Sequence, residues 1–344
     1  MFAVFGRDGT GLVVPAFDVP AAIADATDLD HVVSYGIWRP SSTPGAGVDV
    51  RRIEAILDAS AIDCAEALAD VLDRLSCSQG SIGLDDDGLA HPVRQRLTDR
   101  LTDVKMAPGS GHLAEARRVK SPYEIECLAR ALHIAEEAVD VVIQMLERGT
   151  TEQEAATLYL SEVVKRHAVP RRPFVAVGKR TWMPTAGPTD QALRMGDVVR
   201  LDVGCTYRGY CGSVARTAVL GEPGRAAEAA YAAVRDGLDA ACAALVPGAT
   251  GGQVFDARVK AIEAAGHRSD LGADAGSGIG LAPREKPTLA NGDGTPLLAG
   301  EVLCIESTHC ELGVLGLAVR NTVLVTTDGA RTLNRSRHDL IVLD

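Results

Sequence analysis

Short apolar runs alternate with one amphipathic stretch over residues 1–115. The runs at 3–5 and 11–15 flank Arg7-Asp-Gly-Thr, so they predict a β-hairpin around that turn. Apolar residues at helical spacing over 61–75 predict a helix. Strands are also expected at 31–35 and 81–85, and a loop at 39–48. Strands that alternate with helices favour an α/β domain with a partly parallel sheet.

A longer helical pattern begins after this first domain. Ser121 and Glu124 have the spacing of a capping box, in which the serine caps the helix and the glutamate returns to the cap. Apolar positions at helical spacing then continue to about Arg148. Thr151 and Glu154 repeat the capping pattern and predict a second helix.

A similar helix pair recurs later in the chain. The alanine-rich segment 223–245 predicts one helix and 254–265 predicts the next, and strand-rich segments follow both pairs. This repetition predicts two βααβ-like halves related by a pseudo-twofold axis. We therefore expect two domains, 1–115 and 116–344.

Composition narrows the class of protein. The net charge is -11, which argues against a nucleic-acid partner because phosphate binding needs clustered Lys and Arg. No apolar run approaches the ~20 residues that cross a bilayer. Arg7 and Asp8 stand where a signal peptide would be apolar, so a cytoplasmic location is expected. The 8 cysteines form no C-x-x-C pair and are interpreted as mostly small buried residues.

Four segments carry a resemblance to a known family. They lie at 201–217, 276–287, 303–307 and 318–325. The chain resembles the pita-bread metallopeptidases, which include prolidase, Xaa-Pro aminopeptidase, methionine aminopeptidase and creatinase. The resemblance implies an α/β fold in which a creatinase-like N-terminal domain precedes a pita-bread domain with duplicated βααβ-like halves. It also implies a homodimer.

The metal centre of that family is where this chain departs from the pattern. The resemblance implies two divalent ions held by two Asp, one His and two Glu. The corresponding positions here are Asp202, Ser213, Ser277, Glu306 and Arg320, the last with an uncertainty of one residue toward Asn321. Two carboxylates are therefore retained, and an arginine enters the same space. We predict no metal ion and no other cofactor at this site.

Charge predicts what Arg320 does instead. A guanidinium group can bind a carboxylate through two parallel hydrogen bonds, so it can substitute for a cation between Asp202 and Glu306. A metal ion added beside Arg320 would bring like charges together at a cost of several kcal/mol. We therefore predict that Arg320 pairs with Asp202 or Glu306.

Other catalytic positions of the family are changed as well. Thr185 and Arg284 stand where the resemblance implies two catalytic histidines, and Thr185 also replaces the catalytic histidine of creatinase. Glu285 corresponds to a carboxylate that borders the substrate in the family, so it is a candidate for proton transfer. The alternative is a surface-facing charge beside Lys286.

The remaining candidates have two interpretations each. Asp202 and Glu306 are an acid and a base, or they form a salt bridge with Arg320 that only ties strands together. Ser213 and Ser277 are expected to contact a ligand, because a serine nucleophile needs a base within reach and no His maps near them. Tyr207 is a substrate contact or a packing residue.

Three hypotheses for function remain open. The favoured one is a metal-independent enzyme that acts on a small amide, amidine or amino-acid-derived substrate, in specialised metabolism for example. The others are a non-catalytic binding or scaffold protein and a metallopeptidase with displaced ligands. A ligand is expected in a cleft bounded by Asp202, Ser277, Glu285, Glu306 and Arg320. Arg284 and Arg320 would favour an anionic group on a small molecule there.

Overall fold

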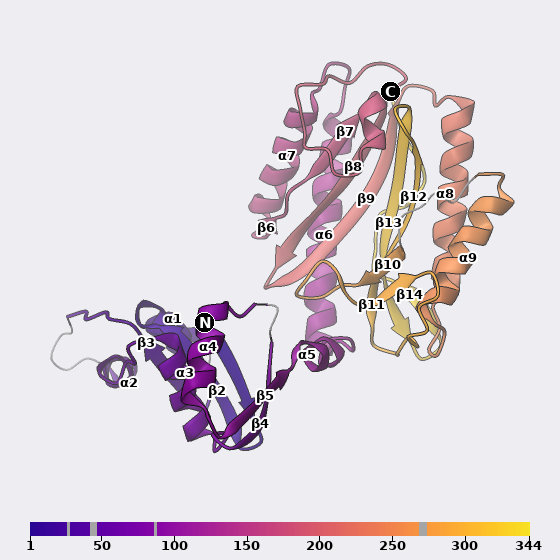
Figure 1. The fold of residues 1–344 in the computed structure, drawn as a ribbon. Coiled ribbons are helices and arrows are strands. Elements are labelled where there is room, and N and C mark those ends of the chain that lie inside the picture. The colour runs from indigo at the N-terminus through magenta and orange to yellow at the C-terminus, as the bar shows by residue number, and fades with distance from the viewer. Residues whose placement is uncertain (26–27, 42–46, 86–87, 268–273) are drawn as a thin grey trace. The chain divides into compact units, whose positions relative to one another are not determined.

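The structure is a computed structural model that describes the chain apart from residues 26–27, 42–46, 86–87 and 268–273 (Figure 1). The chain divides into two compact units, Met1–Leu113 and Ala114–Asp344. Each unit is described by itself below.

The first unit contains two small sheets with helices beside them. A three-stranded sheet has the order β1-β2-β3, and β4 pairs with β5 in a separate sheet. The elements are β1 (Phe2–Gly6), β2 (Gly9–Pro15), a 3-10 turn η1 (Ala16–Asp18), α1 (Val19–Asp25), β3 (His31–Tyr35), α2 (Val48–Asp58), α3 (Cys64–Arg74), β4 (Gly80–Leu84), α4 (His91–Arg100), β5 (Val104–Pro108) and α5 (Ser110–Ala116). The division between the units falls within α5.

The sequence patterns anticipate the main elements of this unit. The predicted hairpin is confirmed, because β1 and β2 pair antiparallel. The predicted partly parallel pairing is also confirmed, between β2 and β3 and between β4 and β5. Helices α2 and α4 were not predicted; α2 buries none of its residues and α4 buries Leu97, so neither shows a long apolar stripe. Part of the predicted loop 39–48 lies outside the described residues.

The second unit is a large mixed sheet with two helix pairs. Its sheet has the order β11-β10-β12-β13-β9-β8-β6, with β7 beside β8, β14 beside β13 and β15 beside β9. The elements are α6 (Pro122–Met145), α7 (Glu152–Lys165), β6 (Val169–Pro170), β7 (Phe174–Val177), η2 (Gly178–Trp182), β8 (Val198–Tyr207), β9 (Tyr210–Leu220), α8 (Arg225–Ala243), α9 (Gly251–Ala264), β10 (Asp274–Gly278), β11 (Glu285–Ala290), β12 (Val302–Glu311), β13 (Leu315–Thr326), β14 (Gly329–Thr332) and β15 (Ile341–Leu343).

Helix boundaries follow local capping. The predicted capping boxes at Ser121 and Thr151 are both present. Helix α9 begins at Gly251, earlier than the predicted 254, because Thr250 and Gln253 form a third capping box. Both helix pairs are followed by strands, as the repeated pattern predicts. The pseudo-twofold relation of the two halves stays a prediction.

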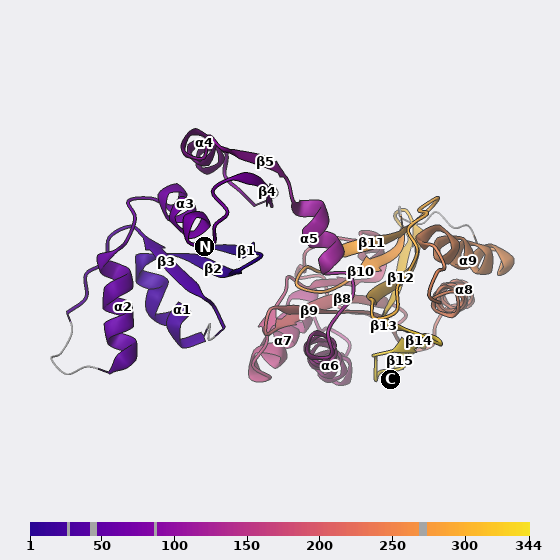
Figure 2. The same cartoon turned by 90° about the horizontal axis from the view of Figure 1, so that it is seen from below.

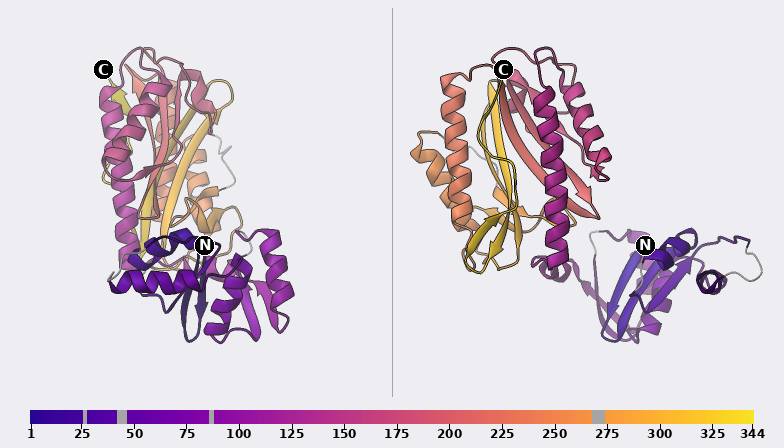
Figure 3. Two further views of the ribbon diagram at one scale, coloured as in Figure 1. Left: turned by 90° about the vertical axis from the view of Figure 1, so that its left-hand side faces the viewer. Right: turned by 180° about the vertical axis from the view of Figure 1, so that it is seen from behind.

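All four long helices of this unit cover one face of the sheet (Figures 1 and 2). Helices α6 and α7 pack on β7, β8 and β9, and α8 and α9 pack on β10 to β13. Figure 3 shows the same layering from the side and from behind. Gly212 of β9 lies against the backbone of α6 at Ala131, where a side chain would have no room. The opposite face of the sheet is thus free of these helices.

No helix in the described part of the chain is both long and apolar enough to cross a membrane.

Candidate functional site

Strand register places the predicted residues in one row across the sheet. Asp202 of β8 pairs with Ala215 of β9, Ala215 pairs with Arg320 of β13, and Arg320 pairs with Glu306 of β12. Directly opposed residues in antiparallel strands project their side chains to the same face. The helix-side core contains the alternate residues of these strands, such as Val203. The row therefore lies on the face away from the helices, which we call the cluster face.

Arg320 is at the centre of this row. Its Nε donates to Oε2 of Glu306 over 3.0 Å, and Nη2 donates to the same oxygen. Nη1 donates to Oδ1 of Asp202 and to Oγ of Ser213, the latter over 3.1 Å. Nη2 also donates to Oδ2 of Asp202 over 3.1 Å. A guanidinium group has five N–H donors, and all of them have an acceptor here.

These four residues, Asp202, Ser213, Glu306 and Arg320, form what we call the Arg320 cluster. The predicted pairing of Arg320 with the carboxylates is confirmed, and it involves both of them. The side chains of Arg320, Asp202 and Glu306 are 14%, 20% and 28% exposed, so the cluster is partly open to solvent.

The ion pairs shift the pKa values in the expected directions. Burial alone would raise the pKa of the Glu306 carboxyl group, but Arg320 outweighs burial and holds that pKa below its usual range. Burial alone would lower the pKa of Arg320, but Asp202 and Glu306 together raise it well above its usual value. Glu306 and Arg320 are therefore both charged at neutral pH.

The residues present do not fit the metal pair that the resemblance implies. Arg320 already occupies the space between the two retained carboxylates, and both of them bind it. Within the described residues, no group of three or more His, Cys, Asp and Glu side chains is arranged to hold a metal ion. Cys304, His309 and Cys310 have suitable ligand types, but they form no such group with the other described residues. A divalent ion in this space would face the Arg320 charge at close range.

The two serines lie on the cluster face but differ in their contacts. Ser213 is part of the Arg320 cluster. Ser277 of β10 pairs with Cys304, two residues from Glu306 on β12. Its side chain is 3% exposed, and its hydroxyl donates to the carbonyl of Gly278 over 3.1 Å. Ser277 is thus near the cluster without a recorded bond to it.

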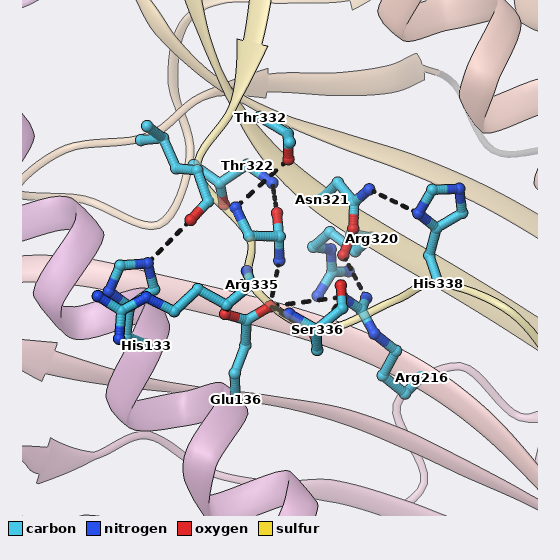
Figure 4. A network of polar contacts seen from close by, with 12 residues as sticks. His133, Glu136, Arg216, Arg320, Asn321, Thr322, Thr332, Arg335, Ser336 and His338 are labelled. Carbon is cyan, nitrogen blue, oxygen red and sulfur yellow. Dashed lines mark hydrogen bonds and ion pairs between the residues drawn. The ribbon is translucent and has the colours of Figure 1, made fainter.

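The uncertainty between Arg320 and Asn321 is resolved by the side of the sheet that each one faces. Asn321 points to the helix side, where its Nδ2 lies 3.4 Å from Nδ1 of His338 (Figure 4). Arg216 lies on the same side and donates through Nη1 to the main-chain carbonyl of Arg320 over 2.8 Å. Glu136 of α6 lies 3.6 Å from the Arg216 guanidinium group. The strand that carries Arg320 is therefore held from both faces.

Glu285 does not fit either interpretation of its role. Its side chain is 8% exposed, so it is not a surface charge. It pairs with Arg117 and with Lys120, the latter over 3.1 Å, and it accepts the N–H of Ala282 over 3.0 Å. Burial opposes ionisation, but the Ala282 N–H and Lys120 lower the pKa of Glu285 overall. A carboxylate held in this way is a poor proton acceptor.

Arg284 is oriented toward a different carboxylate. Its side chain is 58% exposed, and Nη2 bonds Oδ2 of Asp274 over 2.5 Å. Its charge still reaches Glu306 and helps to lower the pKa of that group. Arg284 thus flanks the Arg320 cluster.

Two predicted ligand contacts are not brought to the cluster. Tyr207 is an odd number of residues from Asp202 on an unbroken strand, so it faces the helix side and packs on the core there. This position favours the packing interpretation of Tyr207 over its prediction as a substrate contact. Thr185 is exposed in the loop after η2, where no contact to the cluster is recorded.

Sequence reasoning overlooked Arg200. It precedes Asp202 by two residues on β8 and so projects from the same face. It is 6% exposed and donates to the carbonyl groups of Thr181, Met183 and Pro184, at 2.7, 3.1 and 2.5 Å. Burial lowers its pKa, because desolvation outweighs the nearby carboxylates. The two-residue spacing from Asp202 is the signal that was available.

The Arg320→Ala variant should be much less stable than the parent. Removal of the guanidinium group leaves Asp202 and Glu306 facing each other without a cation, which should lower the free energy of unfolding by about 3 kcal/mol. Urea unfolding measures this, with Arg284→Ala as the control, since that side chain is 58% exposed. An unchanged unfolding midpoint for Arg320→Ala would contradict the central role of this residue.

Acidification should weaken the fold partly through Glu306. Its folded-state pKa is lowered, so its stabilising contribution is present above the unfolded pKa of about 4.3 and is lost as the pH falls through the folded value. Unfolding should be measured between about pH 6 and about pH 3. Glu306→Gln should flatten this dependence, and the exposed Glu222→Gln should retain it. Equal slopes in both variants would show that Glu306 contributes nothing.

Comparison with known proteins identifies the family. Residues 126–327 match the family Peptidase_M24, described as metallopeptidase family M24. The chain is 31% identical to the probable dipeptidase PepE of Mycobacterium tuberculosis over 265 residues, 73% of this chain and 71% of that protein. It is 28% identical to the Xaa-Pro dipeptidase of Pyrococcus furiosus over 232 residues, 67% of this chain and 66% of that protein.

A solved structure shows the same fold. The Xaa-Pro dipeptidase of Bacillus anthracis superposes with a TM-score of 0.84 at 23% identity, and the match covers 99% of this chain and 88% of that one. The predicted α/β pita-bread fold is therefore confirmed, and the scaffold is that of aminopeptidases and dipeptidases. The chain belongs to metallopeptidase family M24.

Proposed function

We propose that this chain binds a small molecule at the cluster face without metal ions, and that Arg320 takes the place of the metal pair. The observation that carries the proposal is the saturation of Arg320. Its five donors are used by Asp202, Ser213 and Glu306, so the cation of this site is part of the chain. Arg200 on the same face brings a second positive charge near both carboxylates, so the two negative charges are balanced without an external ion.

Electrostatics makes the exchange of Arg320 for a metal unfavourable. Two unit charges about 4 Å apart interact with about 4 kcal/mol near a protein surface, and a divalent ion doubles this repulsion. Among the described residues, the Arg320 side chain bonds only to members of the cluster. If a metal ion took both carboxylates, Arg320 would lose its ion-pair partners. A metal ion would have to displace a residue that the fold holds in place.

The same arrangement argues against peptide hydrolysis. A two-metal centre polarises the carbonyl group and supplies an activated water, and Arg320 in its saturated state does neither. Glu285 is bound by Lys120 and Arg117, so it is a poor general base. Thr185 has no basic group. We therefore favour ligand binding over cleavage, although the named relatives are peptidases.

A metal-independent enzyme is the second candidate, and one observation favours it. Both hydrogen bonds from Arg320 to Glu306 use Oε2, which leaves Oε1 for another donor. Glu306 is 28% exposed and Asp202 is 20% exposed. These carboxylates can hold an amine or amidine and exchange a proton with it. Turnover of a small amide or amidine would then depend on Glu306.

A homodimer and a cytoplasmic location accompany the proposal. Both rest on the resemblance and on the sequence, and neither is needed for the metal-free site.

Purified protein should contain far less than one manganese, cobalt or zinc ion per chain. Elemental analysis after incubation with each metal and desalting measures this. The matched variant combines Ser213→Asp, Ser277→His and Arg320→Glu, which restores the five ligand types that the family pattern implies. If this variant keeps the parent's circular dichroism spectrum, it should retain metal. About two tightly held metal ions per parent chain would refute the metal-free site and favour displaced ligands.

The parent should not hydrolyse Xaa-Pro dipeptides. Release of proline from alanyl-proline should stay at the background rate with or without added manganese or cobalt, because the polarising ions have no place to bind. The restored-ligand variant and a metal-loaded prolidase serve as controls. Turnover by the parent that a chelator abolishes would contradict the proposed function.

A further inference from the structure

Arg172 is an exposed arginine for which no carboxylate partner is found among the residues that the structure describes. Its guanidinium carbon lies 5.6 Å from the centroid of the Phe174 ring. In the described part of the chain no ion pair or hydrogen bond of Arg172 is recorded, and the ring contact is its main interaction. An aromatic ring holds a guanidinium group by a cation–π interaction and uses none of its N–H donors. The five donors of Arg172 remain available.

Phe174 connects this arginine to the Arg320 cluster. It is the direct partner of Asp202 in the antiparallel pair of β7 and β8. Its side chain therefore projects from the cluster face, next to Asp202. The neighbouring Val175 and Val177 belong to the helix-side core, as the alternation requires. Phe174 extends the row of the site onto a fifth strand.

The loop after η2 passes beside Arg172. Arg200 fixes the start of this loop by binding the carbonyl groups of Met183 and Pro184, and it also binds that of Thr181 in η2. Farther along the same loop, a Cβ atom built on Gly187 would lie 3.2 Å from Nη2 of Arg172. The glycine thus leaves the space that the guanidinium group occupies. Phe174 is thus the common neighbour of Asp202, through strand pairing, and of Arg172, through the ring contact.

The charges in this part of the face do not balance. Arg172, Arg200 and Arg320 are three guanidinium groups, whereas Asp202 and Glu306 are two carboxylates. Arg320 binds both carboxylates, and Arg200 binds main-chain carbonyl groups. Arg284 pairs with Asp274. Arg200 and Arg320 both interact electrostatically with Asp202 and Glu306, so among these five described residues one positive charge, that of Arg172, is in excess.

We propose that Arg172 and Phe174 form an anion subsite that binds the carboxylate group of a small organic ligand. This inference rests on the proposed function, because the same face binds the ligand. The planar fork of the guanidinium group matches a carboxylate through two parallel hydrogen bonds. The ring of Phe174 packs beside the apolar part of the ligand, and Asp202 is placed to accept an N–H of it. Of the two arginines expected to bind an anion, Arg320 has no free donor for this role and Arg284 pairs with Asp274.

Isothermal titration of the full chain with benzoate tests the subsite, and benzamide is the uncharged probe of the same shape. Benzoate should bind and benzamide should bind at least about tenfold more weakly, because hydrogen bonds to charged groups are the stronger ones. Arg172→Gln should weaken benzoate binding by about tenfold or more, and Arg172→Lys by less, since lysine keeps the charge but loses the fork.

Arg208→Gln is the matched control. Arg208 also lies 5.6 Å from an aromatic ring, that of Tyr207, but it is at the tip of the β8–β9 hairpin and Tyr207 faces the helix side. This variant should bind benzoate like the parent. Equal loss in Arg172→Gln and Arg208→Gln, equal binding of benzoate and benzamide, or no benzoate binding at millimolar concentration would each overturn the subsite.

The outcome is separable from that of the proposed function. Metal content reports on Arg320, and Arg172→Gln should leave it unchanged, because Arg172 is not one of the five ligand positions. If the parent holds metal ions but benzoate binding still depends on Arg172, the metal-free proposal fails and the subsite stands. If the parent is free of metal and Arg172→Gln binds benzoate like the parent, the subsite fails and the metal-free proposal stands.

Discussion

The interaction on which the site depends is the bond of Arg320 to Asp202 and Glu306. It joins side chains of three strands in one row, and Ala215 on the strand between β8 and β13 leaves the space that the arginine crosses. Arg216 donates to the carbonyl group of Arg320 from the helix side, and Glu136 forms an ion pair with Arg216 there (Figure 4). Because the strand is held from both faces, the guanidinium group has a fixed position, and the carboxylates take their orientation from it.

This arrangement changes the balance of negative and positive charges at the site of a metallopeptidase scaffold. A site built to hold two divalent ions needs an excess of carboxylates, and such a site attracts cations. Here serines stand at two of the ligand positions and an arginine at a third. With Arg200 and Arg172 added, positive groups outnumber carboxylates on the same part of the face. The face is therefore suited to an anionic group on its ligand, although the fold is that of its peptidase relatives.

The sequence was sufficient where the signal is local or periodic. Capping boxes at Ser121 and Thr151 mark where two helices begin. Side chains alternate between the two faces of a strand, so the odd spacing between Asp202 and Tyr207 already predicts opposite faces. It was insufficient where partners are remote in the chain. Glu285 is held by Arg117 and Lys120, more than 160 residues away, and nothing near Glu285 indicates them. The choice between Arg320 and Asn321 depended on register across β12 and β13, which one sequence does not specify.

A guanidinium group and a metal ion place different demands on a ligand. A metal ion offers open coordination positions that a substrate or water can fill, whereas a saturated arginine offers none. Any ligand at this face must therefore bind to groups that Arg320 leaves available, which include Oε1 of Glu306, the remaining acceptor positions of Asp202 and the donors of Arg172. Because Phe174 and the loop fixed by Arg200 already position Arg172, little ordering is needed when a ligand arrives, and a preorganised site binds more tightly for the same contacts. Arg320 thus also orients the two carboxylates that the proposed binding site would use.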